Sequence, residues 1–259
     1  MAALANAVRK VFRRKNKVPL ACSEILLDDL DHVHTSACFL DVQPLVVAEL
    51  FQSQGCKFSV KNVPKIHEAV QHDTNIAFVT FDVTYFDRTE WQDTFASKQW
   101  DSRQRAYVTK WGRNSVFTPQ IVFDGVTDGT GEYANDVRAL VDQARHIRSE
   151  KGWNILLDAN DTELRIDTDR SESVAHEILL IYYEPKTQTV RIGKGVNRWK
   201  KLKHINVVKT VSKVGVWEGG DLTLPLPLPA LTEAREQGLS ALAVVQEPSG
   251  GPIVAAHAL

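Results

Sequence analysis

The stretch LVVAELFQSQGCKFS at residues 45–59 decides the fold. It begins with an apolar run interrupted only by Glu49, which is typical of a strand buried on both faces of a parallel sheet. A polar turn follows, and apolar residues then recur at helical spacing at Val60, Val63, Ile66 and Val70. The pattern predicts a strand, a loop and a helix, with Cys56 at the start of the helix.

The pattern continues from this unit toward the C-terminus. An apolar run at 76–81 predicts a second strand, which completes a βαβ unit with a right-handed crossover. The aromatic and charged residues 85–111 indicate mostly helix, residues 121–123 indicate a strand, and residues 137–147 indicate an amphipathic helix. We therefore expect an α/β fold whose first domain spans residues 44–152.

From Trp153 onward the sequence changes to short apolar runs separated by polar or proline-rich turns. The runs lie at residues 155–157, 164–166, 178–183, 190–192, 205–211, 222–226 and 239–245. They predict a second, β-rich domain over residues 153–259 that packs against the first. Residues 1–43 show no sustained periodicity, so we expect a partly disordered N-terminal extension there.

The charge balance argues against a partner selected by the net charge of the chain. Lysine and arginine number 31 and aspartate and glutamate 32, so we expect no nucleic acid partner. A local basic stretch lies at residues 9–17, before the first acidic residue of the chain. No apolar run is long enough for a membrane-spanning helix. The oligomeric state is left open.

Three cysteines at unrelated spacings, Cys22, Cys38 and Cys56, cannot make a closed disulfide framework. We therefore expect a reducing, cytoplasmic compartment, with mitochondrial targeting by the basic N-terminus as the alternative. No cluster of cysteine and histidine supports a metal site.

Cys56 is the first candidate for chemistry. A thiol at a helix N-terminus faces unpaired backbone N–H groups and the positive end of the helix dipole, which favour the thiolate, and Lys57 adds a neighbouring positive charge. This position suits a nucleophile, and we expect Cys56 to be solvent-accessible there. The alternative is a small buried hydrophobic residue, which is the usual role of a free cysteine.

Further motifs occur in a fixed order along residues 44–255. They read ELFQSQGC at 49–56, VTYFD at 83–87, RQRAY at 103–107, FTPQ at 117–120, GVNR at 195–198, HINVV at 204–208, GVW at 215–217 and GGPI at 250–253. Together they resemble the thioredoxin-like family of unknown function called DUF1223. The Val-Thr-Tyr variant and the basic leader look more like the fungal branch of that family.

The resemblance implies roles for particular residues. The motif of the family reads Gln-Gly-Cys-x-x-Cys, and here Ser59 takes the place of the second cysteine. A serine cannot resolve a mixed disulfide, so the dithiol cycle is unavailable at this motif. Whether Cys22 or Cys38 resolves it instead stays open. Thr118-Pro119 matches the position at which the fold places a cis-proline against the cysteine; the alternative is a trans proline that opens a strand.

From these positions and this resemblance, the catalytic candidates are Cys56, Ser59 and Glu49, and the substrate-binding candidates are Gln54, Gly55, Tyr85, Thr118 and Pro119. Ser59 would hydrogen-bond the thiolate. Glu49 has two readings: an inward acid near the thiol with a raised pKa, or a carboxylate paired with Arg103 or Arg105.

Two functions compete. The first is a thiol protein in which Cys56 acts as a nucleophile or in a transient mixed disulfide, as a monothiol oxidoreductase, isomerase or transferase recruited to a biosynthetic reaction. Its partner would be a small-molecule thiol or a protein thiol, with glutathione as a candidate co-substrate and no other cofactor. The second is a non-catalytic binding or scaffolding protein that has lost dithiol redox activity.

Overall fold

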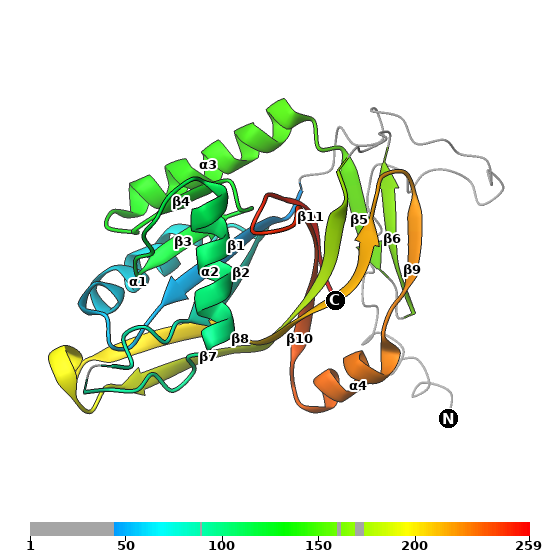
Figure 1. The fold of residues 1–259 in the computed structure, drawn as a ribbon. Coiled ribbons are helices and arrows are strands. Elements are labelled where there is room, and N and C mark those ends of the chain that lie inside the picture. The colour runs from blue at the N-terminus through cyan, green and yellow to red at the C-terminus, as the bar shows by residue number, and fades with distance from the viewer. Residues whose placement is uncertain (1–43, 89, 160–161, 169–173) are drawn as a thin grey trace, which may run out of the picture. The chain divides into compact units, whose positions relative to one another are not determined.

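The computed structural model describes residues 44–88, 90–159, 162–168 and 174–259, and the elements of this part of the chain confirm an α/β fold. In chain order they are β1 (Val46–Gln52), α1 (Lys57–Val70), β2 (Ile76–Asp82), α2 (Lys98–Lys110), β3 (Gln120–Phe123), β4 (Thr127–Gly129), α3 (Ala134–Lys151), β5 (Ile155–Ala159), β6 (Glu163–Thr168), β7 (His176–Arg191), the 3-10 helix η2 (Gly195–Asn197), β8 (Lys201–Trp217), β9 (Leu222–Pro225), α4 (Leu228–Glu236), β10 (Ser240–Gln246) and β11 (Ile253–Ala258). An eight-stranded sheet has the order β11-β10-β7-β8-β2-β1-β3-β4, and a three-stranded sheet has the order β5-β6-β9 (Figure 1).

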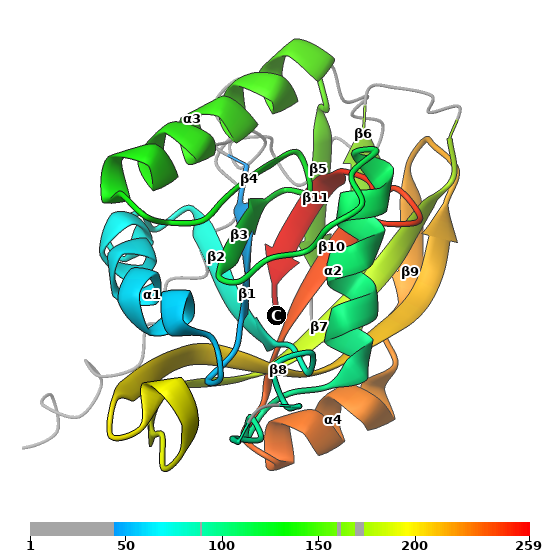
Figure 2. The ribbon, with the colours of Figure 1, turned by 60° about the vertical axis from the view of Figure 1, so that its left-hand side comes forward.

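The predicted unit of strand, loop, helix and strand is present as β1, α1 and β2. β1 pairs in parallel with β2, from Val46 opposite Ile76 to Gln52 opposite Asp82, and antiparallel with β3. Every residue of β1 is buried, because helices cover both faces of the sheet here (Figure 2). One face packs with α1 and α3, and the other packs with α2 through Phe51.

The strands after residue 152 continue the same sheet. β8 joins the parallel strand β2 at the pair Thr80 and Val207, and β7, β10 and β11 extend the sheet beyond it. The predicted boundary at 152/153 coincides with the end of α3, where Gly152 has a φ of 58°. Residues Gln43–Leu259 nevertheless form one compact unit, because strands from both predicted segments share one sheet.

One local expectation was wrong. Residues 85–111 are not mostly helix: α2 begins only at Lys98, because Ser97 caps it by accepting a hydrogen bond from the Gln99 N–H at 3.3 Å. Before that point the Asp93 carboxylate binds the Phe95 N–H and bends the chain. The sequence analysis also missed α4, which begins within a leucine and proline alternation, and β11.

The predictions for residues 1–43, including the basic stretch, Cys22 and Cys38, lie outside the described residues. Within the described part, no helix is long and apolar enough to span a membrane.

Candidate functional site

Cys56 lies at the N-cap of α1, as predicted, and faces the loop that precedes β3. Its φ of −86° and ψ of 122° are extended, and the helix begins at Lys57. The thiol donates a hydrogen bond to the Thr118 carbonyl oxygen, with 3.2 Å between sulfur and oxygen. The Thr118-Pro119 bond is cis, which confirms that expectation. Two segments 62 residues apart therefore meet at the thiol.

The thiol is less accessible than expected. Cys56 is only 2% exposed, which corrects the expectation that it would be solvent-accessible. Tyr85 is part of the same surroundings: its hydroxyl donates to the Gln104 Oε1 at 3.3 Å, and burial is the main cause that raises its pKa above the usual value. Thr118 and Cys56 are both among the groups that influence that pKa, so Tyr85 lies near them, and its substrate-binding assignment stays a prediction.

Asn197 holds the cysteine loop from the far half of the chain. Its side-chain N–H group donates to the carbonyl oxygens of Gln54 and Cys56, each at 2.9 Å. Asn197 is buried within η2, the turn between β7 and β8. Asn197 belongs to the GVNR motif at residues 195–198, but its place in the sequence does not predict this role.

Gln54 supports the loop. Its side chain is fully buried, and its Oε1 accepts hydrogen bonds from Trp91 at 2.8 Å and from the Thr94 hydroxyl at 3.2 Å. The backbone N–H of Gln54 donates to Asp93 at 2.6 Å. The adjacent Gly55 is also buried, and its N–H donates to the Ser53 hydroxyl at 3.1 Å. These internal partners argue against a direct contact of the Gln54 side chain with a substrate, and the substrate-binding assignment of Gln54 and Gly55 stays a prediction.

Ser59 also lies elsewhere than expected. Its hydroxyl oxygen accepts a hydrogen bond from the Ser53 N–H at 3.3 Å, and the residue is fully buried. The structure therefore places this hydroxyl on the loop backbone, where it helps to fix the turn between β1 and α1, and the expected bond to the Cys56 thiolate is not formed.

Glu49 pairs with an arginine, which confirms one of its two readings. The Arg103 Nη2 lies 2.5 Å from the Glu49 Oε1, and the Arg103 Nε contacts both carboxylate oxygens at 3.1 and 3.2 Å. Arg103 also donates to Tyr107 and to Gln246 of β10. A carboxylate held in this way by a guanidinium is occupied by its partner, which argues against the catalytic assignment of Glu49.

A buried polar cluster missed by the sequence analysis lies behind the loop. The His204 Nδ1 lies 3.1 Å from the Asp82 Oδ1 and 2.6 Å from the Gln52 Nε2, and His204 and Asp82 are fully buried. Burial first, and then the neighbouring Asp82, raise the pKa of Asp93 to about 7. Gln52 and Asp82 end adjacent parallel strands, a signal that could have placed them together.

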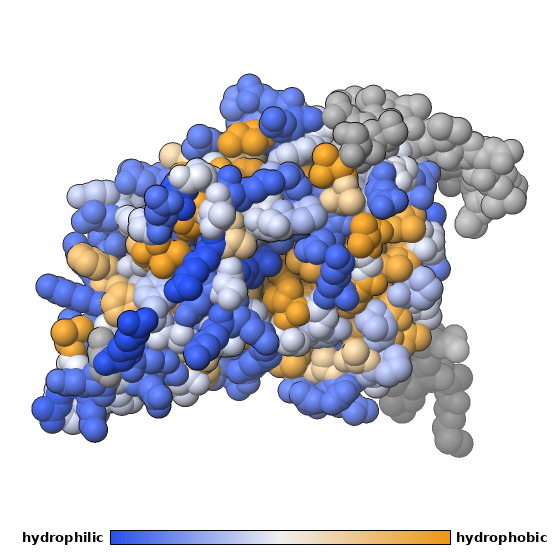
Figure 3. Space-filling view, viewed as in Figure 1, coloured by the Kyte–Doolittle hydropathy of each residue, from blue (hydrophilic) through white to orange (hydrophobic). Residues whose placement is uncertain are grey.

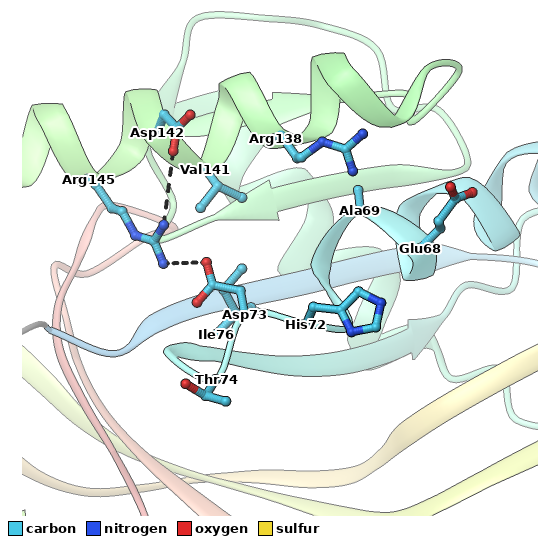
Figure 4. A pocket seen from close by; sticks show the side chains of 10 residues that line it. All are labelled: Glu68, Ala69, His72, Asp73, Thr74, Ile76, Arg138, Val141, Asp142 and Arg145. Atoms are coloured by element: carbon cyan, nitrogen blue, oxygen red, sulfur yellow. Dashed lines mark hydrogen bonds and ion pairs between the residues drawn. The ribbon is translucent and has the colours of Figure 1, made fainter.

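Another concave region lies at the opposite end of α1 from Cys56, between that end and α3 (Figure 4). This groove has a volume of about 480 Å³ and carries both cationic and acidic side chains. Arg145 pairs there with Asp73 at 2.7 Å, and the Asp142 carboxylate is 4.0 Å away. The groove therefore neutralises most of its own charge. Among the described residues, no three potential ligands gather to hold a metal ion.

Two solved structures resemble this chain over most of its length. A crystal structure of a protein from Agrobacterium tumefaciens has a TM-score of 0.64 and 27% sequence identity, covering 84% of this chain and 95% of that chain. HBP35 of Porphyromonas gingivalis has a TM-score of 0.54 and 10% identity, covering 84% of this chain and 75% of its own, and shows likeness of fold alone. No curated protein matches the chain.

The family comparison agrees with the resemblance inferred from the motifs. Residues 47–246 match the family described as "Protein of unknown function (DUF1223)", a match that includes Cys56, Thr118, Asn197 and His204. Because the match spans well over half of the chain, this protein belongs to the DUF1223 family.

Proposed function

We propose that this protein is a thioredoxin-like thiol protein of the fungal type that acts through Cys56. The unit of β1, α1 and β2, the cysteine at the first turn of α1 and the proline before β3 support the thioredoxin-like assignment. The Val-Thr-Tyr sequence at residues 83–85 supports the fungal assignment. The work of the protein would then be thiol exchange at a single sulfur, in a reducing compartment such as the cytoplasm.

One observation carries the proposal: the Cys56 sulfur is 3.2 Å from the Thr118 carbonyl oxygen, beside a cis peptide bond. That oxygen accepts a hydrogen bond from the thiol. A substrate backbone that donates its own N–H to Thr118 would displace the thiol from this acceptor. The sulfur would then face only the N–H groups at the start of α1, which favour the thiolate.

The reaction that fits one cysteine is formation of a mixed disulfide. The Cys56 thiolate attacks one sulfur of a disulfide, the old S–S bond breaks, a new S–S bond forms to Cys56, and the other sulfur leaves as a thiolate. A second thiol, from a small molecule such as glutathione or from a protein, then attacks the mixed disulfide and releases Cys56. Ser59 has no sulfur and takes no part in this exchange.

The second candidate function is a binding or scaffolding protein without thiol chemistry. It is favoured by the burial of Cys56, which leaves the thiol only 2% exposed, and by the bond of the Ser59 hydroxyl to the loop. On this reading Cys56 is a small buried side chain that helps α1 to pack.

A neutral disulfide separates the two candidates. The full chain carrying Cys22→Ser and Cys38→Ser, so that Cys56 is the one thiol, is incubated with 2-hydroxyethyl disulfide, and the adduct is measured by intact mass. Thiol exchange predicts one adduct on the folded protein, removed by reduced glutathione. An adduct that forms only in urea would establish the second candidate.

A gain of function gives an independent check. The wild-type protein should not reduce insulin disulfides catalytically, whereas Ser59→Cys should gain part of this activity because it supplies a resolving thiol. Wild-type turnover that survives replacement of Cys22 and Cys38 would contradict the monothiol mechanism.

A further inference from the structure

A strongly basic segment lies beside Cys56 at the turn between β7 and β8. Residues 191–203 contain six cationic side chains and no acid: Arg191, Lys194, Arg198, Lys200, Lys201 and Lys203. We call this segment the basic lobe. The net charge of −1 for the whole chain does not reveal this local concentration of cationic side chains.

The basic lobe is fixed next to the thiol. Asn197, in its middle, binds the Cys56 carbonyl oxygen at 2.9 Å. In Figures 1 and 2 the lobe, drawn in yellow, lies beside the end of α1 at which Cys56 is located. Lys57 and Phe58, at the first turn of α1, are exposed, and Phe58 is 58% exposed. The lobe and the first turn of α1 therefore both present exposed side chains next to the cysteine loop.

The lobe also exposes large apolar side chains, which surfaces normally present singly. Trp199 is 58% exposed and Val196 is 71% exposed. The Trp199 ring is contacted by the guanidinium groups of Arg191, at 5.0 Å, and Arg198, at 4.6 Å, measured to the ring centroid. Figure 3 shows mainly hydrophilic residues around a small apolar spot at the lower left, where the lobe lies in Figure 1.

This surface is held in place by the backbone. The Trp199 N–H donates to the Ile192 carbonyl oxygen at 2.7 Å, and the Ile192 side chain is fully buried in the core beside α1. Trp199 is therefore exposed in the folded turn itself, and the lobe does not have to unfold to present its ring. An aromatic ring flanked by two guanidinium groups binds carboxylates and planar peptide groups.

The charges of the lobe are available to a ligand. None of its six cationic side chains forms an ion pair with another described residue. The acid that does contact the lobe, Glu90, accepts a hydrogen bond from the Gly195 backbone N–H at 3.1 Å. The surface beside Cys56 is therefore electropositive, although the net charge of the whole chain is −1.

We propose that the basic lobe, with Lys57 and Phe58, binds the carboxylates of a short acidic peptide disulfide and presents its sulfur to Cys56. The inference rests on the proposed function and adds the class of substrate to it. Arg191, Arg198 and Lys57 contact the carboxylates, while Trp199 and Phe58 contact the peptide. The disulfide of glutathione, an acidic tripeptide, is the smallest probe of this class.

The test compares three disulfides that differ in charge: glutathione disulfide, which is anionic, 2-hydroxyethyl disulfide, which is neutral, and cystamine, which is cationic. The rate of adduct formation at Cys56 is measured by intact mass on the chain with Cys22→Ser and Cys38→Ser, and each rate is divided by the rate with free cysteine. All three disulfides require the buried Cys56 site to open, so a comparison of their normalised rates reports mainly the effect of charge. We expect glutathione disulfide to exceed cystamine by about tenfold or more at low salt, the lower end of electrostatic steering. The ratio should approach one at high salt.

A matched pair of variants locates the effect. Arg198→Glu and Arg138→Glu change the net charge equally and both replace exposed arginines, but Arg138 lies on α3, in the groove at the other end of α1. Arg198→Glu should abolish the preference for glutathione disulfide, and Arg138→Glu should leave it. Equal normalised rates for the three disulfides, or equal effects of the two variants, would overturn the inference about the substrate. Reaction of Cys56 with the neutral disulfide would still support the proposed thiol exchange.

A second readout does not require thiol chemistry. In Cys56→Ser protein, glutathione disulfide should shift the indole N–H resonance of Trp199, and the neutral disulfide should not. This shift could occur while the folded chain with Cys22→Ser and Cys38→Ser forms no adduct at Cys56. That combination would reject the proposed thiol exchange and support the surface that binds acidic peptides. The absence of a shift would reject the proposed binding of acidic peptides to this surface. A single-stranded oligonucleotide that displaced glutathione disulfide equally well would reject it too, because the surface would then bind any polyanion.

Discussion

Replacing His67 by phenylalanine tests how the fold tolerates a buried imidazole. His67 is only 5% exposed on α1, and neither ring nitrogen has a hydrogen-bond partner among the described residues. Its ring packs edge-on against Phe78, with 5.2 Å between centroids, beside a pocket of about 270 Å³. Burial first, and then the charges of Lys203 and His204, lower the pKa of His67 from 6.5 to about 4.

The sign of the pH effect follows from this shift. A base whose pKa is lower in the folded state binds fewer protons there, so its contribution to stability is complete above pH 6.5 and is lost as pH falls toward 4. At 1.36 kcal/mol for each unit, wild-type protein should lose about 2 kcal/mol at pH 5 and about 3 kcal/mol at pH 4 through His67 alone.

Asp93 acts in the opposite direction, because its raised pKa makes the folded state bind a proton more readily as pH falls below 7. The quantity to measure is therefore the difference in the free energy of unfolding between His67→Phe and wild type, from urea denaturation between pH 7 and pH 4. At pH 7 the two should be close, since an apolar ring replaces an unpartnered polar one.

The variant should gain on wild type by about 2 kcal/mol at pH 5 and by about 3 kcal/mol at pH 4. His72→Phe, which replaces an exposed histidine just after the end of α1, is the control for the substitution itself. A difference that stays flat from pH 7 to pH 4 would refute the reasoning, because His67 would then bind protons alike in the folded and unfolded states.

Three further predictions concern the site and its support. Asn197→Ala should destabilise the protein by about 2 kcal/mol in urea denaturation, because two buried carbonyl oxygens lose their donor, and should speed alkylation of Cys56; unchanged stability and reactivity would contradict its role in holding the loop. Arg103→Met should cost about 3 to 5 kcal/mol by leaving Glu49 buried and unpaired, and adding Glu49→Leu should recover most of this loss; a double-mutant cycle measures the coupling. Deleting residues 153–259 should leave a molten or insoluble fragment, seen by lost near-UV circular dichroism and by dye binding, because β2 loses its partner β8; a cooperatively unfolding fragment would show that the shared sheet is not needed.

Much of the local structure could be predicted from the sequence. The apolar run of β1 and the helical spacing of α1 are periodic signals within a few residues, and they locate Cys56 at the helix start. The pairing of Glu49 with Arg103 was foreseeable as one of two outcomes, because a lone acid in a buried strand requires a cation. The motif around Thr118 also indicated the cis bond.

Only the tertiary structure decided how the cysteine loop is held and covered. Asn197 and His204 lie 141 and 152 residues from their partners Cys56 and Gln52, and neither local periodicity nor spacing encodes contacts over such separations. The burial of the thiol, the internal bonding of Gln54 and the nearness of the basic lobe all depend on β7 and β8 joining the sheet beside β2. The sequence by itself thus determined where α1 begins and that a cis Thr118-Pro119 bond precedes β3. The sheet pairing determined what surrounds them, because it brings the distant turn of residues 191–203 against the first turn of α1.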